Sequence, residues 1–178
     1  MKKINKLILV IVIALPLVSM TILNEKLVVK KILENKVSIK IPVSFKELSK
    51  KERINNFQRG YTPVAAFSDK TETVFVVFNQ PAMKPATQES IDLYKDKYVE
   101  LNDYFANCID SGIVKNNNKK VGFINVDGLK LKQKPIYLAM SFTDAYGRIL
   151  ECKFYCPANK KEQWKDIANE IIKSFTVN

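Results

Sequence analysis

The sequence predicts an α+β protein in which an antiparallel-rich sheet carries helices packed on it, preceded by an N-terminal apolar helix. Three observations predict this architecture. Short segments that alternate apolar and polar residues come in pairs around turn signals, which is typical of antiparallel hairpins. Residues 87–106 and 159–175 repeat apolar side chains at helical spacing. Residues 7–23 carry no charge and directly follow a group of lysines.

The uncharged run from Leu7 to Leu23 indicates either a cleaved signal peptide or a membrane anchor. Its 17 residues span about 25 Å as a helix, which is short for a hydrocarbon core of about 30 Å. Ser19 and Thr21 fit the small-residue cleavage pattern poorly, and both alternatives stay open. A basic start followed by an apolar core is the usual export signature. We therefore expect an extracytoplasmic domain, either anchored in the inner membrane or released to the periplasm or medium.

Behind this run, residues 24–36 are expected to form a lysine-rich linker, and residues 37–178 a single α+β domain of ordinary size. The linker is amphipathic, with apolar residues at near-helical spacing: Leu27, Val28, Ile32 and Leu33.

The first half of the domain predicts a strand, a short helix and a hairpin. Val37 to Pro42 alternates apolar and polar residues, which predicts a strand that either lies on an edge or ends at the proline. Ser49 to Phe57 is predicted as a short helix. Pro63 to Ser68 and Thr73 to Phe78 are predicted as two hairpin strands, of which the second is apolar on both faces and therefore covered on both sides.

A long helix is predicted next, from Thr87 as its N-cap to about Ala106. Strands at Cys108 to Lys115 and Lys120 to Val126 follow, joined by an asparagine turn. The buried stripe of the helix is expected to consist of Ile91, Tyr94, Tyr98, Leu101 and Phe105.

The last part of the chain predicts another strand pair and a closing helix. Ile136 to Phe142 and Leu150 to Cys156 alternate around a turn at Asp144 to Gly147. Asn159 and Glu162 have the spacing of a capping box at the start of the closing helix. Its apolar stripe is formed by Trp164, Ile167, Ala168, Ile171, Ile172 and Phe175.

This order of elements resembles the PsbP-like fold, which includes the bacterial DcrB-like envelope proteins. The resemblance rests on a first strand ending in Ile41-Pro42, a hairpin, a long helix, a four-strand meander and a closing helix ending in Ser174-Phe175, and it covers residues 37–178. It implies a sandwich of that type and a non-enzymatic role in binding, assembly or as a chaperone. No family binding motif matches position by position, so the resemblance assigns no functional residue.

The absence of certain residues excludes several chemistries. The chain has no histidine, which removes Ser-His-Asp and Cys-His catalysis and histidine-ligated zinc. Its five glycines form no phosphate-binding loop, and no C-x-x-C motif is present. We therefore predict no catalytic residue, no cofactor and no metal site.

The three cysteines allow at most one disulfide. Cys152 and Cys156 are four residues apart in a predicted strand, so their Cα atoms lie about 13 Å apart and cannot be bridged. A bond from Cys108 to one of them stays open beside the simpler alternative of three free thiols.

The chain is basic, with a net charge of +11. Removing residues 1–23, which hold three lysines and no acid, leaves 26 basic and 18 acidic residues, or +8. Only three of the basic residues are arginine, the better phosphate ligand, and the lysines are spread along the chain. We expect exposed lysines and no nucleic-acid partner, while contact with anionic lipid or an acidic wall polymer stays open.

Two loops are the candidate partner-binding sites, because tyrosine, arginine and methionine are favoured at interface cores. Arg59 and Tyr61 precede the hairpin, whereas Gln80, Met83 and Lys84 precede the long helix. The expected function is a non-enzymatic envelope module that binds a protein, or else an immunity protein that occludes a toxin. A carboxylate-pair hydrolase is the remaining alternative, with acids on the long helix: Glu89, Asp92, Asp96, Glu100 and Asp103.

Overall fold

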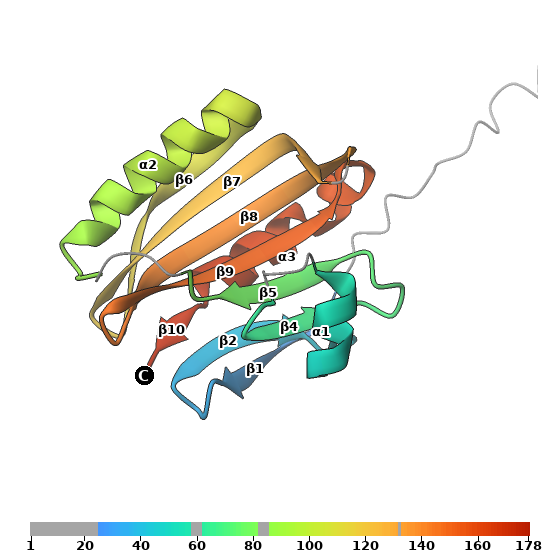
Figure 1. The fold of residues 1–178 in the computed structure, drawn as a ribbon, viewed down its shortest axis with the longest axis horizontal. Helices are drawn as coiled ribbons and strands as arrows, with labels where there is room; N and C mark the ends of the chain where they lie inside the picture. The colour runs from blue at the N-terminus through green and yellow to red at the C-terminus, as the bar shows by residue number, and fades with distance from the viewer. Residues whose placement is uncertain (1–24, 58–61, 82–85, 132) are drawn as a thin grey trace, which may run out of the picture.

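The structure, a computed structural model, describes residues 25–57, 62–81, 86–131 and 133–178 (Figure 1). The predicted apolar helix at residues 7–23 lies outside these ranges. Within them, no helix is both long enough and apolar enough to cross a membrane.

The described residues form two antiparallel sheets and three helices (Figure 1). The small sheet has the strand order β1-β2-β10 and the large sheet the order β3-β4-β5-β9-β8-β7-β6. The small sheet contains β1 (Leu27–Ile32), β2 (Val37–Pro42) and β10 (Thr176–Val177). The large sheet contains β3 (Lys46–Glu47), β4 (Ala65–Ser68), β5 (Phe75–Asn79), β6 (Asn107–Asn116), β7 (Lys119–Leu131), β8 (Lys134–Ala145) and β9 (Arg148–Pro157). The helices are α1 (Lys50–Asn56), α2 (Ser90–Phe105) and α3 (Lys161–Lys173).

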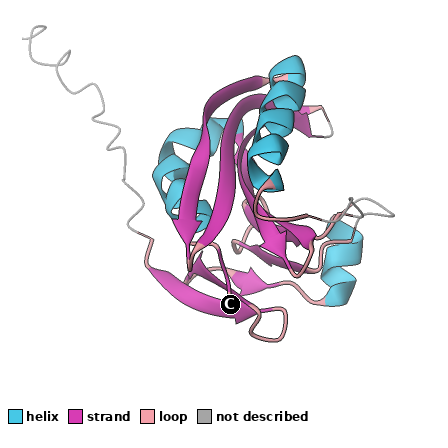
Figure 2. Cartoon of the chain, turned by 90° about the vertical axis from the view of Figure 1, so that its left-hand side faces the viewer, coloured by secondary structure: helices cyan, strands magenta, loops and turns pink. Residues whose placement is uncertain are grey.

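The helices lie on opposite faces of the large sheet (Figure 2). α3 packs with the small sheet against one face and closes the main core, where Trp164 contacts the rings of Phe45 and Phe154. α2 and α1 share the other face, each over its own apolar cluster. β9 serves both faces because its side chains alternate, with Cys152 and Phe154 in the main core and Glu151 on the side of α2.

Most predicted elements are confirmed. Ser49 caps α1 in a capping box with Glu52, β4 and β5 form the predicted hairpin, and β6 to β9 form the predicted meander. β5 is buried along its whole length, as a strand covered on both sides should be. The predicted stripe of α3 is also confirmed, with Ile171, Ile172 and Phe175 fully buried.

The segment predicted as a linker contains a strand. β1 pairs with β2 along its whole length, from Leu27 opposite Pro42 to Ile32 opposite Val37. The interpretation of its apolar residues as near-helical is therefore wrong, because the spacing in a short apolar run fits a helix and a strand equally well. Of the two alternatives predicted for β2, the second is confirmed: the strand ends at Pro42 and lies at the centre of the small sheet, between β1 and β10.

Two predicted helix caps are also wrong. α2 begins at Ser90, whose hydroxyl accepts from the backbone N–H of Thr87 and donates to its carbonyl, so Thr87 is not the N-cap. α3 begins at Lys161 after a single 3-10 turn at Ala158–Lys160, and no side chain caps it. Glu162 instead pairs with Lys165 in the same helix.

Candidate functional site

α2 is fixed to the large sheet by its N-terminal half. Ile91 is fully buried, and the ring of Tyr98 lies 4.8 Å from the ring of Phe142 on β8. The Tyr98 hydroxyl donates a hydrogen bond to the Glu151 carboxylate on β9. These contacts hold one flank of the helix above β8 and β9.

The C-terminal half of the same helix leaves large apolar side chains in solvent. The exposed fractions are 56% for Leu101, 83% for Tyr104 and 63% for Phe105. The predicted burial of Leu101 and Phe105 is therefore wrong, since the sheet covers only the first part of the predicted stripe. Tyr94 and Tyr98 are half-buried, between these two extremes.

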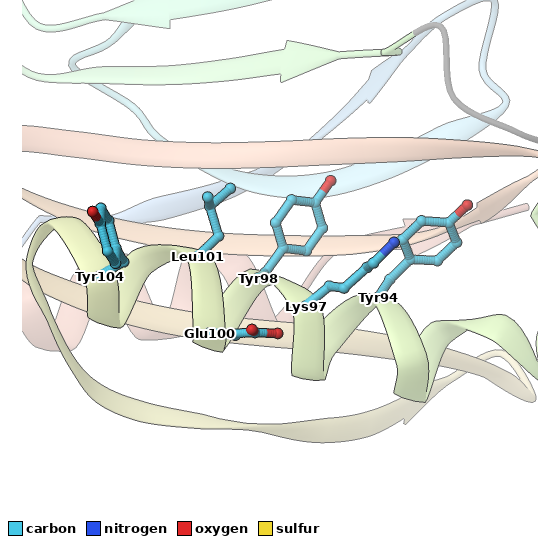
Figure 3. Close-up of a pocket in the computed structure, with 6 residues that line it drawn as sticks. All are labelled: Tyr94, Lys97, Tyr98, Glu100, Leu101 and Tyr104. Carbon is cyan, nitrogen blue, oxygen red and sulfur yellow. The ribbon is translucent and has the colours of Figure 1, made fainter.

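A groove of about 420 Å³ runs along this flank of α2. Figure 3 shows Tyr94, Tyr98 and Leu101 projecting from one side of the helix, with Tyr104 near its C-terminal end. Lys97 and Glu100 complete the lining. We call this feature the α2 groove. Its walls are mostly aromatic and aliphatic, with one charge of each sign, and such walls are typical of a recognition site.

A buried polar cluster lies beside the groove on the same face of the sheet. Glu151 is 3% exposed, and its second carboxylate oxygen is 2.6 Å from the Lys153 ammonium. Asn79 on β5 is opposite Glu151 in the strand register and is 4% exposed. Lys153 balances the charge of the Glu151 carboxylate, and the hydrogen bond from Tyr98 joins α2 to the sheet. The cluster of Glu151, Lys153, Tyr98 and Asn79 contains no second acid that could act with Glu151 in acid–base catalysis.

An acidic stripe follows the outer edge of α2. Its members recur at intervals of three and four residues and therefore share one side of the helix. Lys120 pairs with Asp92 at 2.6 Å and holds the pKa of that carboxyl below its usual value. A hydrogen bond from Thr87 lowers the pKa of Glu89. The lowered pKa values of Asp92 and Glu89 favour their ionised forms, which does not suit the general acid of a carboxylate pair. The stripe consists of Glu89, Asp92, Asp96, Glu100 and Asp103.

The predicted loop residues lie mostly outside the described residues. This holds for Arg59, Tyr61, Met83 and Lys84, so their role as a partner site stays a prediction. Gln80 is described: it is exposed and directly follows Asn79, next to the polar cluster.

Sequence reasoning missed the α2 groove, although a signal was present. α2 carries apolar residues outside its predicted stripe, among them Leu93 and Tyr104, and both are exposed. A helix that covers one face of a sheet needs a single apolar stripe. The surplus of apolar residues indicates a second contact surface.

The thiols show no sign of nucleophilic chemistry. Cys108, Cys152 and Cys156 are all free, and burial raises the pKa of each. For Cys156 the pKa rises to about 12, so the reactive thiolate is suppressed at neutral pH. Among the described residues, no group of three cysteines or acids is arranged to hold a metal ion.

Comparison with known proteins defines the fold class. No family model and no curated protein matches this sequence. Among solved structures, cyanobacterial PsbP (CyanoP) from Synechocystis sp. PCC 6803 is similar over 86% of this chain and 94% of that chain, with 14% identity and a TM-score of 0.55. LpqN, which is involved in cell envelope biogenesis of Mycobacterium tuberculosis, is similar over 80% and 83%, with 10% identity and a TM-score of 0.52.

A Bacteroides thetaiotaomicron protein is similar at 14% identity with a TM-score of 0.50, over 84% of this chain and 48% of its own. The chain therefore has the PsbP-like fold that its order of elements predicts. At these identities the likeness establishes the fold alone.

Proposed function

We propose that this protein is a non-enzymatic accessory module of the cell envelope that binds a protein partner in the α2 groove. The observation that carries the proposal is the exposure of Leu101, Tyr104 and Phe105 on a helix whose other half is seated on the sheet. Contiguous apolar side chains with a polar rim mark interaction surfaces. The fold likeness to LpqN supports a role in the envelope.

The proposed location rests on the sequence of residues 1–23. A basic start followed by the apolar run from Leu7 to Leu23 directs the chain to the membrane, either as an anchor or as a cleaved signal. Fractionation of a C-terminally tagged chain, with mass spectrometry of its N-terminus, distinguishes the two. An intact Met1 in the membrane fraction means an anchor, and a new N-terminus near Ile22 in the exported fraction means cleavage. An intact chain in the cytosol contradicts the location.

The acidic stripe indicates the chemistry of the partner. Residues 89–103 hold five acids and two lysines, whereas the whole chain has a net charge of +11. A partner that fits the groove and meets this stripe presents apolar side chains on one side and basic side chains on the other. An amphipathic helix laid along α2 satisfies both requirements.

A matched pair of synthetic peptides tests this recognition. One peptide is an amphipathic helix with leucine on one face and lysine on the other, and the second carries glutamate in place of lysine. We expect the lysine peptide to bind and the glutamate peptide not to bind. The double variant Leu101→Ser/Tyr104→Ser should weaken binding by about tenfold or more, because it removes two anchors of the groove.

Val43→Ser/Ile54→Ser is the control, since these apolar residues are 56% and 50% exposed outside the groove. It should leave binding within about twofold, and both double variants should keep the free energy of unfolding within about 1 kcal/mol of wild type. Equal losses in the two double variants would show non-specific adhesion and refute the groove.

The alternatives make different demands. An immunity role calls for an acidic toxin if the basic surface is used, whereas the α2 groove is bordered by acids and favours a basic partner. A hydrolase calls for a protonated carboxyl, which the lowered pKa values of Asp92 and Glu89 disfavour. Turnover of an envelope substrate by the purified chain would overturn the non-enzymatic proposal.

A further inference from the structure

A lysine-rich surface lies where several chain ends and turns meet, away from the exposed end of α2. β6 begins just after α2 and runs for ten residues to the β6–β7 turn, so about 30 Å separates this turn from the C-terminal end of α2. Figure 1 shows the β6–β7 turn near the end of the chain, and the yellow end of α2 at the other end of the sheet.

Hydrogen bonds join three elements at this surface. Asn116, at the tip of the β6–β7 hairpin, donates through its side-chain nitrogen to the carbonyls of Lys173 and Phe175, each at 2.8 Å. The backbone N–H of Lys40 on β2 donates to the Ser174 hydroxyl at 2.9 Å. These bonds hold Lys40, the hairpin tip and the end of α3 in fixed positions.

A groove of about 410 Å³ lies between these elements, and we call it the basic groove. Lys40 and Lys115 line it together with the polar side chains of Ser38 and Asn117. Among the described residues, the Lys115 ammonium and the Asn117 amide have no hydrogen-bond or ion-pair partner. Both groups are therefore available to donate hydrogen bonds to a ligand.

Further lysines surround the groove. Lys36 and Lys119 both lie over the exposed ring of Tyr146, with ammonium-to-centroid distances of 5.9 and 5.6 Å. Lys173 lies over the Phe123 ring, and Lys31 is opposite Ser38 in the strand register. The acids that pair with lysines here are Glu34, bound to Lys36, and Glu170, bound to Lys40.

Six lysines and two glutamates therefore lie on strands and turns that these hydrogen bonds join. Like charges held close repel one another and oppose the compact state. An anion that bridges them removes the repulsion and gains charge-assisted hydrogen bonds. We infer that the basic groove binds a linear polyanion whose charged units are phosphate groups. A strand of polymer fits a concave groove lined by hydroxyl and amide groups, whereas a bilayer presents a flat surface.

The probe is inorganic polyphosphate, and its binding to the full-length chain is measured by titration calorimetry at several salt concentrations. The site variant is Lys115→Gln/Lys119→Gln, and the control is Lys50→Gln/Lys51→Gln on α1. Each pair removes two charges: Lys50, Lys51 and Lys115 are exposed, and Lys119 is half-buried. Polyphosphate should bind the wild type, and the site variant should lose about tenfold in affinity.

The salt dependence identifies contacts within the groove. Each lysine–phosphate contact that is lost lowers the slope of log affinity against log salt by about one, so the site variant should lose about two and the control none. The double variant Leu101→Ser/Tyr104→Ser should bind polyphosphate like wild type, which separates this inference from the proposed function. Equal losses in both lysine pairs, an absence of binding, or binding only to phosphatidylglycerol vesicles would each overturn the inference.

Discussion

Glu151 is the residue at which α2 and the large sheet meet. Its carboxylate accepts from the Tyr98 hydroxyl and pairs with Lys153 while being 3% exposed. Glu151→Gln removes the charge that balances a half-buried ammonium, so we expect the free energy of unfolding to fall by about 3 kcal/mol. Tyr98→Phe removes only the hydroxyl and should lower it by about 1 kcal/mol.

Urea unfolding of both variants measures these losses. Because Tyr98→Phe keeps the ring against Phe142, it serves as the milder control for the same contact. A Glu151→Gln variant as stable as wild type would show that the charge of Glu151 does not stabilise this contact.

Glu52 predicts the dependence of stability on pH. The Ser49 backbone N–H, the Ser49 hydroxyl and the Lys46 ammonium lower its pKa from 4.5 to about 2. A lowered pKa means that its stabilising contribution is complete above about pH 4.5 and is lost as the pH falls toward 2. The thermal midpoint should fall over this window, and less steeply in Glu52→Gln.

The absence of histidine predicts how the thermal midpoint depends on pH near neutrality. With no histidine in the chain, no side chain of ordinary pKa titrates between pH 6 and 8, and the midpoint should be nearly constant there. A wild type and a Glu52→Gln variant with identical acid profiles would show that the cap of α1 does not contribute.

At the residue scale, the sequence limited which cysteines can pair but not how far each apolar side chain is buried. The strand spacing of Cys152 and Cys156 excluded a bond between these two, because their Cα atoms lie too far apart. It left a bond from Cys108 open, and the structure shows all three cysteines free. The exposure of Leu101 could not be predicted, because periodicity shows which side of a helix is apolar but not how much of that side a sheet covers.

At the scale of elements, β7 and β8 fit closely because one position has no side chain. Gly122 on β7 is opposite Phe142 on β8, and a Cβ atom at this glycine would lie 2.5 Å from the ring. Gly122→Ala should therefore lower the free energy of unfolding by about 2 kcal/mol through overpacking. The ring cannot easily move, because Tyr98 contacts it from α2.

Double-mutant analysis checks this mechanism. Gly122→Ala/Phe142→Leu should recover part of the loss, since the smaller side chain leaves room for the added methyl group. An additive double variant would mean that the cost arises from the backbone and not from the contact with the ring.

The larger elements were predictable because they are long and strongly periodic. The meander β6 to β9 and the closing helix α3 repeat their patterns over ten or more residues. β1, β3 and β10 have six, two and two residues and depend on partners far away in the chain, as when β10 pairs with β2. Local patterns carry no information on such pairing, so the small sheet was missed.

At the scale of the whole molecule, the C-terminal end of α2 and the β6–β7 turn differ in charge and in exposed apolar surface. Acids and exposed aromatic side chains follow α2, whereas lysines gather around the β6–β7 turn and the end of α3. This arrangement gives one module two contact surfaces of different chemistry. The two proposals together assign a basic, apolar partner segment to one of these surfaces and an anionic polymer to the other.

The central claim is that the α2 groove holds a protein partner, and site-specific crosslinking tests it most directly. A photo-reactive amino acid is placed at Leu101 or at Val43 in the full chain, because both are 56% exposed. In cells that produce the protein, Leu101 should give one discrete adduct with an envelope protein, which Tyr104→Ser abolishes, and Val43 should give none. Identical adduct patterns at the two positions, or no adduct at Leu101, would contradict the account.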